Sequence, residues 1–129
     1  ADYTRAIRID PDYFLAYYNR GLTYSVLGRL KGSDNYKDAI SNFTRAIRID
    51  PDYSLAYYNR GNAYAHLGND EDAIADYTTA IRIEPDYATA YVGRGVVREF
   101  AGLAYCSDYK RACDLGEEQG CEYYYKQCR

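Results

Sequence analysis

The chain repeats one short motif three times. It reads TRAIRIDPDY at residues 4–13 and 44–53, and TTAIRIEPDY at residues 78–87. Pro51 and Pro85 are 34 residues apart, whereas Pro11 and Pro51 are 40 apart. A period of this length is typical of a solenoid, because each repeat is one supersecondary unit that buries its apolar face by stacking on its neighbours. The repetition therefore predicts a stack of similar units.

The spacing of aromatic residues and glycine predicts that each unit contains helices. Tyr57, Gly61 and Tyr64 are separated by four and three residues, which places them on one stripe of an α-helix. The glycine lets a neighbouring helix approach where a side chain would hold it off. We expect this first helix to cover about residues 54–67.

Polar residues mark where one helix ends and the next begins. Gly68 and Asn69 are suited to end the first helix, and Asp70 is a candidate N-cap for a second helix. That second helix carries Ala73, Ile74, Tyr77, Ala80 and Ile81, and Pro85 stops it. Each unit is therefore expected to be a helical hairpin.

One copy carries an insertion. The segment from Gly28 to Asp38 has six more residues than the corresponding Gly68 to Asp72, which accounts for the longer interval between Pro11 and Pro51. An insertion at this place is expected to lengthen a surface loop or a helix end.

The repeat resembles the tetratricopeptide consensus, in which aromatic, glycine, alanine and proline residues recur at fixed spacing. The matching residues are Tyr57, Gly61, Tyr64, Ala73, Tyr77, Ala80 and Pro85 in one copy, and Tyr17, Gly21, Tyr24, Ala39, Phe43, Ala46 and Pro51 in the copy before it. The third copy keeps Tyr91 and Gly95 but has Arg98 in place of an aromatic residue and Tyr105 in place of alanine. The resemblance implies an all-α solenoid of antiparallel hairpins in a right-handed superhelix, with first helices lining a concave groove.

The repeats divide the chain into five segments. They are the second helix of a truncated preceding repeat (1–13), a repeat with the inserted segment (14–53), a consensus repeat (54–87), a divergent repeat (88–116) and a C-terminal capping helix (117–129). Because Ala1 corresponds to Ala75, we expect a fragment of a longer repeat protein with an exposed N-terminal repeat end.

Composition and motifs exclude several classes of function. The formal net charge of −3 gives no basic surface for nucleic acid, and no apolar run is long enough for membrane insertion. His66 is the only histidine, and neither a phosphate-binding loop nor a nucleophile motif accompanies it. We therefore expect no enzyme, no cofactor and no metal site, and we interpret His66 as a groove or surface residue.

A second stripe on the first helices predicts a binding groove. It lies beside the stripe that packs inside each hairpin, and its predicted groove residues are Tyr18, Asn19, Leu22, Leu55, Tyr58, Asn59, Asn62, His66, Val92 and Val96. An alternative is that some of these residues only fill the gap to the adjacent repeat. In the tetratricopeptide family, an asparagine at the place of Asn19 and Asn59 commonly holds the backbone of an extended peptide.

Two more specific ligand classes can be tested on the sequence. Tetratricopeptide domains that bind the carboxylate tail of chaperones have cations at the places of Tyr18, Thr89 and Gly93, and an asparagine at the place of Leu22. Because this chain lacks those cations, a chaperone tail is disfavoured as its ligand.

Arg20, Arg60 and Arg94 recur just before the helix glycines. In one interpretation the aliphatic part of each side chain is buried and its guanidinium group pairs with an acid such as Asp76 or Asp72. In the other, the three guanidinium groups form a row that binds an anionic ligand.

The four cysteines lie near the C-terminus at positions that favour two disulfides. Facing residues of antiparallel helices have position numbers with a constant sum, and 113 plus 121 equals 106 plus 128. We therefore predict the disulfides Cys113–Cys121 and Cys106–Cys128 in a helical hairpin that caps the solenoid. Four free thiols in a reducing cytoplasm and a four-cysteine zinc site are the alternatives. The motif ACDLGEEQGC also resembles the helicobacter cysteine-rich proteins, solenoid relatives linked to penicillin binding.

These observations predict a protein-protein interaction scaffold whose partner is a protein, bound as an extended peptide or a helix in the Tyr/Asn groove. Two other functions stay open. One is an extracytoplasmic cysteine-rich solenoid with β-lactam recognition, and the other is a structural protein that self-associates through its exposed N-terminal repeat end. Bridged cysteines favour a periplasmic or secreted location, and free thiols a cytoplasmic one.

Overall fold

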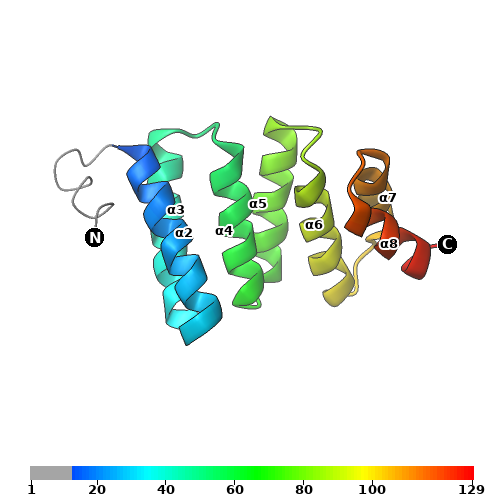
Figure 1. Cartoon of the computed structure of the whole chain (residues 1–129), viewed down its shortest axis with the longest axis horizontal. Coiled ribbons are helices and arrows are strands. Elements are labelled where there is room, and N and C mark those ends of the chain that lie inside the picture. Colours follow the sequence, from blue (N-terminus) through cyan, green and yellow to red (C-terminus); the bar gives the residue numbers. More distant parts are fainter. Residues whose placement is uncertain (1–12) are drawn as a thin grey trace.

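The computed structural model describes residues 13–129 as a row of α-helices (Figure 1). The helices are α2 (Phe14–Lys31), α3 (Ser33–Ile49), α4 (Ser54–His66), α5 (Asp70–Ile83), α6 (Ala88–Phe100), α7 (Cys106–Asp114) and α8 (Glu118–Gln127). Each helix packs chiefly on its neighbours in sequence. The expected all-α stack of helical hairpins is therefore confirmed. The segment expected to be a truncated second helix lies, except for residue 13, outside the described residues.

The boundaries of the hairpins follow the recurring motif. Helix α4 begins directly after Tyr53, whose carbonyl accepts a hydrogen bond from the amide of Ala56 at 3.1 Å. It ends at His66, and Gly68 follows with a φ of 77°, a left-handed conformation that glycine adopts without strain. The amide of Asn69 then donates to the carbonyl of Tyr64 at 2.9 Å. The predicted helix end is thus confirmed.

The start of the next helix differs from the prediction by one residue. Asn69 occupies the N-cap position, and Asp70 is the first residue of α5. Asp70 begins a first turn that also contains Glu71 and Asp72. Carboxylates in this turn stabilise the partial positive charge of the helix N-terminus without capping it directly.

The inserted segment lengthens two helices. The 40-residue offset makes Val26 the counterpart of His66, yet α2 continues past Val26 to Lys31. Helix α3 begins at Ser33, so only Gly32, with a φ of 125°, joins the two helices. The α2–α3 hairpin therefore extends beyond the end of the α4–α5 hairpin.

Close packing inside each hairpin explains why glycine and alanine recur. A Cβ atom on Gly21 would lie 2.6 Å from the ring of Phe43, and one on Gly95 would lie 2.6 Å from the ring of Tyr109. Both distances are far below a van der Waals contact of about 3.5 Å. The buried alanines Ala39, Ala46, Ala56, Ala73, Ala80, Ala90 and Ala112 bring the helix backbones together in the same way.

The divergent third repeat keeps the same internal packing. Tyr109 is 1% exposed and takes the place of Tyr77. Tyr105, which replaces an alanine, is half-buried and packs its ring 5.4 Å from that of Tyr109. The larger residue is accommodated because it precedes α7 instead of lying within it.

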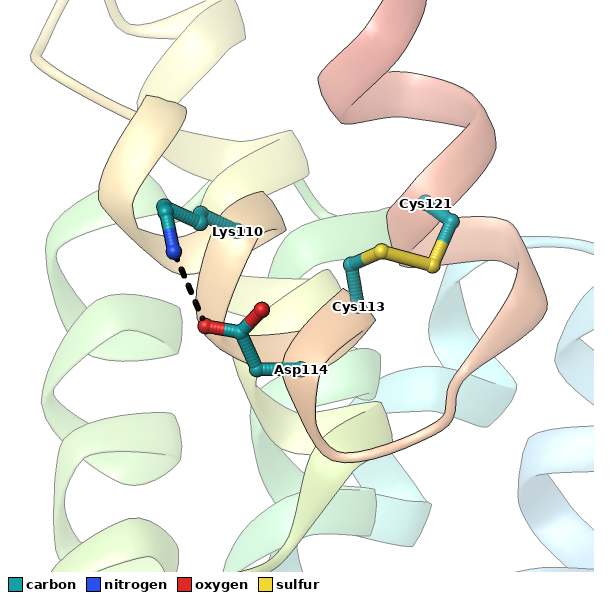
Figure 2. Close-up of a disulfide and its surroundings, with 4 residues drawn as sticks. All are labelled: Lys110, Cys113, Asp114 and Cys121. Carbon is teal, nitrogen blue, oxygen red and sulfur yellow. Dashed lines mark hydrogen bonds and ion pairs between the residues drawn. A yellow bond between two sulfur atoms is a disulfide. The ribbon is translucent and has the colours of Figure 1, made fainter.

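Two disulfides close the C-terminal hairpin of α7 and α8. Cys106 pairs with Cys128 at a Cα–Cα distance of 5.7 Å, and Cys113 pairs with Cys121 at 4.3 Å. Figure 2 shows Cys113 and Cys121 meeting across the two helices, beside the ion pair between Lys110 and Asp114 of α7. These pairs are the ones that the constant sum of positions predicts. Helix α8 packs mainly on α7, so the disulfides tie the last helix to the stack.

Candidate functional site: a groove along α2, α4 and α6

Three adjoining hollows lie along the first helices of the hairpins, and we call them together the groove. The first, of about 430 Å³, lies between α2 and α4, and the second, of about 310 Å³, lies between α4 and α6. The third, of about 500 Å³, follows at the C-terminal ends of α4 and α6. His66 lines all three, and Asn62 lines the first two. The groove is therefore continuous across three hairpins.

The first hollow has both polar and apolar lining residues and carries one permanent charge. Its lining residues are Leu22, Ser25, Val26, Arg29, Tyr36, Asn59, Asn62, Ala63 and His66. Tyr36, at the start of α3, stacks on His66 with ring centroids 4.6 Å apart and an interplanar angle of 10°. The lengthened α2–α3 hairpin thus forms one wall of this hollow.

The second and third hollows are mainly apolar. The second is lined by Tyr58, Asn62, Ala65, His66, Tyr77, Thr89, Val92, Gly93, Val96, Val97 and Gln119. Phe100, which is 86% exposed, and Val96 line the third. Small residues create the second hollow, because a Cβ atom on Gly93 would lie 2.8 Å from the ring of Tyr77.

Two asparagines in the groove are held by tyrosines of the hairpins. The side-chain amide of Asn59 donates to the hydroxyl of Tyr18 at 2.9 Å and to the carbonyl of Leu55 at 2.9 Å. The hydroxyl of Tyr77 donates to Oδ1 of Asn62. These bonds occupy the donor side of Asn59 and the acceptor side of Asn62. Asn59 therefore presents its oxygen, and Asn62 its NH₂ group, for other partners.

Tyr18 is not in the groove, which corrects the sequence prediction. It is 8% exposed, and its ring lies 5.1 Å from that of Tyr53 and 5.8 Å from that of Phe43. Burial raises the pKa of Tyr18 to about 12. The side chain fills the space between the hairpins, as the alternative interpretation has it.

The other predicted groove residues divide into two groups. Leu22, Tyr58, Asn59, Asn62, His66, Val92 and Val96 line the hollows. Asn19 and Leu55 line none of the three, and Leu55 is 41% exposed in the first turn of α4. Tyr58 is half-buried and packs 5.1 Å from Tyr87, so it contributes both to the groove and to the joint between hairpins.

We expect the fold to lose stability at alkaline pH because of buried tyrosines. An unfolded tyrosine ionises near pH 10, whereas burial holds the folded pKa of Tyr18 at about 12. Between about pH 10 and pH 12 the unfolded chain loses the Tyr18 proton while the folded chain keeps it, which favours unfolding. The stabilisation by neutral, buried Tyr18 is therefore complete below about pH 10 and is lost as the pH rises towards 12. Tyr18→Phe should move the alkaline unfolding transition, followed by circular dichroism and tyrosinate absorbance, to higher pH. Tyr125→Phe, at an exposed ring, should leave it unchanged, and an unshifted transition in Tyr18→Phe would contradict the assignment.

Two of the three recurring arginines, Arg60 and Arg94, are paired with carboxylates inside the stack, and the third, Arg20, donates to Asn42. Arg60 holds Asp76 through two hydrogen bonds of 2.8 Å and donates to Thr44 of the preceding hairpin at 3.1 Å. Arg94 repeats this arrangement with Asp108 and Thr78. The structure favours the paired interpretation over an anion ladder, since these guanidinium groups already bind carboxylates. Arg60 and Arg94 also tie their hairpins to the one before.

The described residues, 13–129, contain no group of histidine, cysteine or acidic side chains arranged to hold a metal ion. Within the same part of the chain, no helix combines the length and hydropathy needed to cross a bilayer.

Comparison with known proteins agrees with the geometry. A sequence profile described as Tetratricopeptide repeat matches residues 54–87, and one described as TPR repeat matches residues 1–28 and 33–68. A solved structure described as the second TPR of Spaghetti (RPAP3) bound to HSP90 peptide SRMEEVD is 30% identical. That match has a TM-score of 0.72 and covers 79% of this chain and 91% of the other. The chain belongs to the tetratricopeptide repeat family.

Other solved tetratricopeptide structures are similar. The second TPR domain of human RPAP3, in complex with HSP70 peptide SGPTIEEVD, is 29% identical with a TM-score of 0.75, and the match covers 85% of this chain and 90% of that one. MamA is 21% identical with a TM-score of 0.82, covering 96% of this chain and 81% of the other, and this match shows the fold alone. A comparison with curated protein sequences finds no match. The resemblance to the helicobacter cysteine-rich proteins rests on the sequence motif.

Sequence reasoning missed several groove residues of this tetratricopeptide protein. Arg29 and Tyr36 lie in the inserted segment, which has no counterpart in the other repeats. Gly93, which stands where chaperone-binding relatives have a cation, also opens the second hollow. The length of the insertion was the available signal, because six added residues exceed what a tight turn between helices needs.

Proposed function

We propose that this protein is a non-catalytic interaction scaffold that binds an extended peptide or a partner's helix in the groove. The observation that carries the proposal is the continuity of the three hollows, which share His66 and expose apolar side chains beside unused amide groups. Apolar hollows bury ligand side chains, and polar groups between them fix the orientation of the ligand backbone.

The amide groups suit a peptide backbone. Asn59 offers an acceptor and Asn62 a donor, and a peptide unit supplies one N–H and one C=O. Tetratricopeptide domains of known structure bind peptides in complexes with HSP90 and HSP70 sequences, which supports a peptide ligand of some kind here.

The chaperone tail itself is a poor fit. Tyr18, Leu22, Thr89 and Gly93 replace the residues that bind a terminal carboxylate in chaperone-binding relatives. An arginine at position 93 would also meet the ring of Tyr77, because a Cβ atom there would already lie 2.8 Å from it. Binding of a chaperone tail in the manner of the chaperone-binding relatives is therefore disfavoured.

We expect Thr89→Trp to block the groove. Thr89 is exposed and lines the second hollow, so a bulky uncharged side chain at this position fills the hollow without entering the core and without adding a charge. A library of random peptides displayed on phage, selected on the native protein, should yield binders that lose at least about tenfold in affinity for Thr89→Trp, or about 1.4 kcal/mol.

The matched control is Thr23→Trp. Thr23 is also an exposed threonine on a first helix, but it lines none of the three hollows. Peptide affinity should be unchanged in this variant, and helical circular dichroism should be unchanged in both. Equal binding to Thr89→Trp and to the native protein would move the ligand site away from the groove.

A further inference from the structure

The inserted segment adds a wall to the groove and places a cation in it. Arg29 lies beyond Val26, which is the counterpart of the last residue of α4, so it belongs to the added part of α2. Tyr36 fixes this part, because a Cβ atom on Gly28 would lie 2.8 Å from its ring and the same ring stacks on His66. The wall is therefore packed against α4 and is not a loose loop.

Arg29 differs from the paired arginines of the stack. Arg60, Arg94 and Arg98 each contact a buried carboxylate at 2.9 Å or less. Arg29 is exposed, and within the part of the chain that the structure describes it takes part in none of the ion pairs. It is the one permanently charged residue among those lining the first hollow, beside the amides of Asn59 and Asn62. This hollow consequently suits an anionic group.

The neighbouring hollow differs from the first in its charge. Among its described lining residues none carries a permanent charge, and Val92, Val96 and Val97 form much of its wall. Because Asn62 and His66 line both hollows, a ligand that fills one passes directly into the other. An extended peptide advances about 3.3 Å per residue, so residues only a few positions apart reach both.

We propose that the groove selects a peptide that carries a carboxylate within a few residues of a bulky apolar side chain. The carboxylate binds Arg29 in the first hollow, and the apolar side chain enters the second hollow over Gly93. This specificity rests on the proposed peptide-binding function. The carboxylate belongs either to an aspartate or glutamate side chain or to the C-terminus of the partner.

The test uses a random peptide library displayed once with free and once with blocked C-termini. Selected peptides should be enriched in an acidic residue, or a free C-terminus, close to Leu, Ile, Phe or Trp. Arg29→Gln should weaken such a peptide about threefold to fivefold at low salt, because the ion pair is exposed, and the difference should shrink as salt is added. Arg82→Gln, at an exposed arginine near the end of α5 that lines none of the three hollows, is the matched control and should not change the affinity.

Synthetic variants of one selected peptide identify the source of the carboxylate. If replacement of its acidic residue by the amide removes the Arg29 effect, the carboxylate is a side chain, and if C-terminal amidation removes it, the carboxylate is terminal. Selected peptides that lack any carboxylate, or that bind Arg29→Gln as well as the native protein, would overturn the inference while leaving peptide binding intact. A concentration-dependent mass that Arg29→Gln abolishes would assign the groove to a second copy and would also overturn it. Failure to select any peptide sensitive to Thr89→Trp would instead reject the proposed function.

Discussion

Asp108→Ala is expected to lower the free energy of unfolding by about 3 kcal/mol, since removing one partner of a buried ion pair leaves uncompensated charge. Asp108 is 2% exposed and binds two arginines, Arg94 at 2.8 Å and Arg98 at 2.9 Å. The side chain of Arg98 is 27% exposed and regains some hydration, which keeps the loss near the lower end of the usual range. Urea or thermal unfolding measures the change.

Two controls separate burial from charge. Asp114→Ala removes a carboxylate from the same helix, but that side chain is 53% exposed and its pair with Lys110 lies at the surface, so the change should stay within about 0.5 kcal/mol. Asp108→Asn should cost about 1–2 kcal/mol, because an amide still accepts a hydrogen bond. The first hairpin shows such a pair, in which Arg20 donates to Asn42 at 2.6 Å. A loss below about 1 kcal/mol in Asp108→Ala would mean that the arginines are hydrated without their partner.

Removing the disulfides should destabilise the C-terminal hairpin, with the wider loop giving the larger effect. Cys106 and Cys128 are 22 residues apart, whereas Cys113 and Cys121 are 8 apart. A disulfide stabilises the fold by lowering the conformational entropy of the unfolded chain. From the loop lengths, we expect the free energy of unfolding to fall by about 3.4 kcal/mol in the double serine variant of the first pair and by about 2.5 kcal/mol in that of the second. Chemical unfolding of each double variant measures the loss.

Intact mass after alkylation without reductant checks the premise of that prediction. Freshly purified protein should gain no alkyl groups, and each double serine variant should also gain none, because its remaining pair stays bridged. Four labelled cysteines on native protein would reject the pairing, and with it the inference of a periplasmic or secreted location.

The helical stack could be predicted because its determinants are local in sequence. Gly61 and Tyr77 lie at fixed places within one repeat, and the contact between them needs only the hairpin geometry. Arg60 and Asp76 directly precede Gly61 and Tyr77, so the same hairpin geometry brings them together as an ion pair. The cysteine pairs depend on the antiparallel arrangement of α7 and α8, which fixes facing positions once the turn is located.

The groove was harder to predict, because burial there depends on the next hairpin. Tyr18 and Tyr58 share a stripe with groove residues, but the ring of Tyr53 covers Tyr18, and nothing in the periodicity of α2 reveals this contact. The wall built by Arg29 and Tyr36 cannot be derived from the repeat pattern, because an insertion has no copy in the other repeats to show its conformation.

The disulfides also make the hairpins of the stack unequal in stability. All four cysteines lie from Cys106 onward, so one end is joined covalently while the α2–α3 hairpin is held by packing and hydrogen bonds. In a one-dimensional stack each unit is stabilised mainly by its neighbours, and hairpins differ in the free energy needed to open them locally. The disulfides raise this free energy for the α7–α8 hairpin, so we expect the α2–α3 and α4–α5 hairpins to open more readily. The side of the groove at Phe100, in the helix that packs on α7, should therefore persist longest.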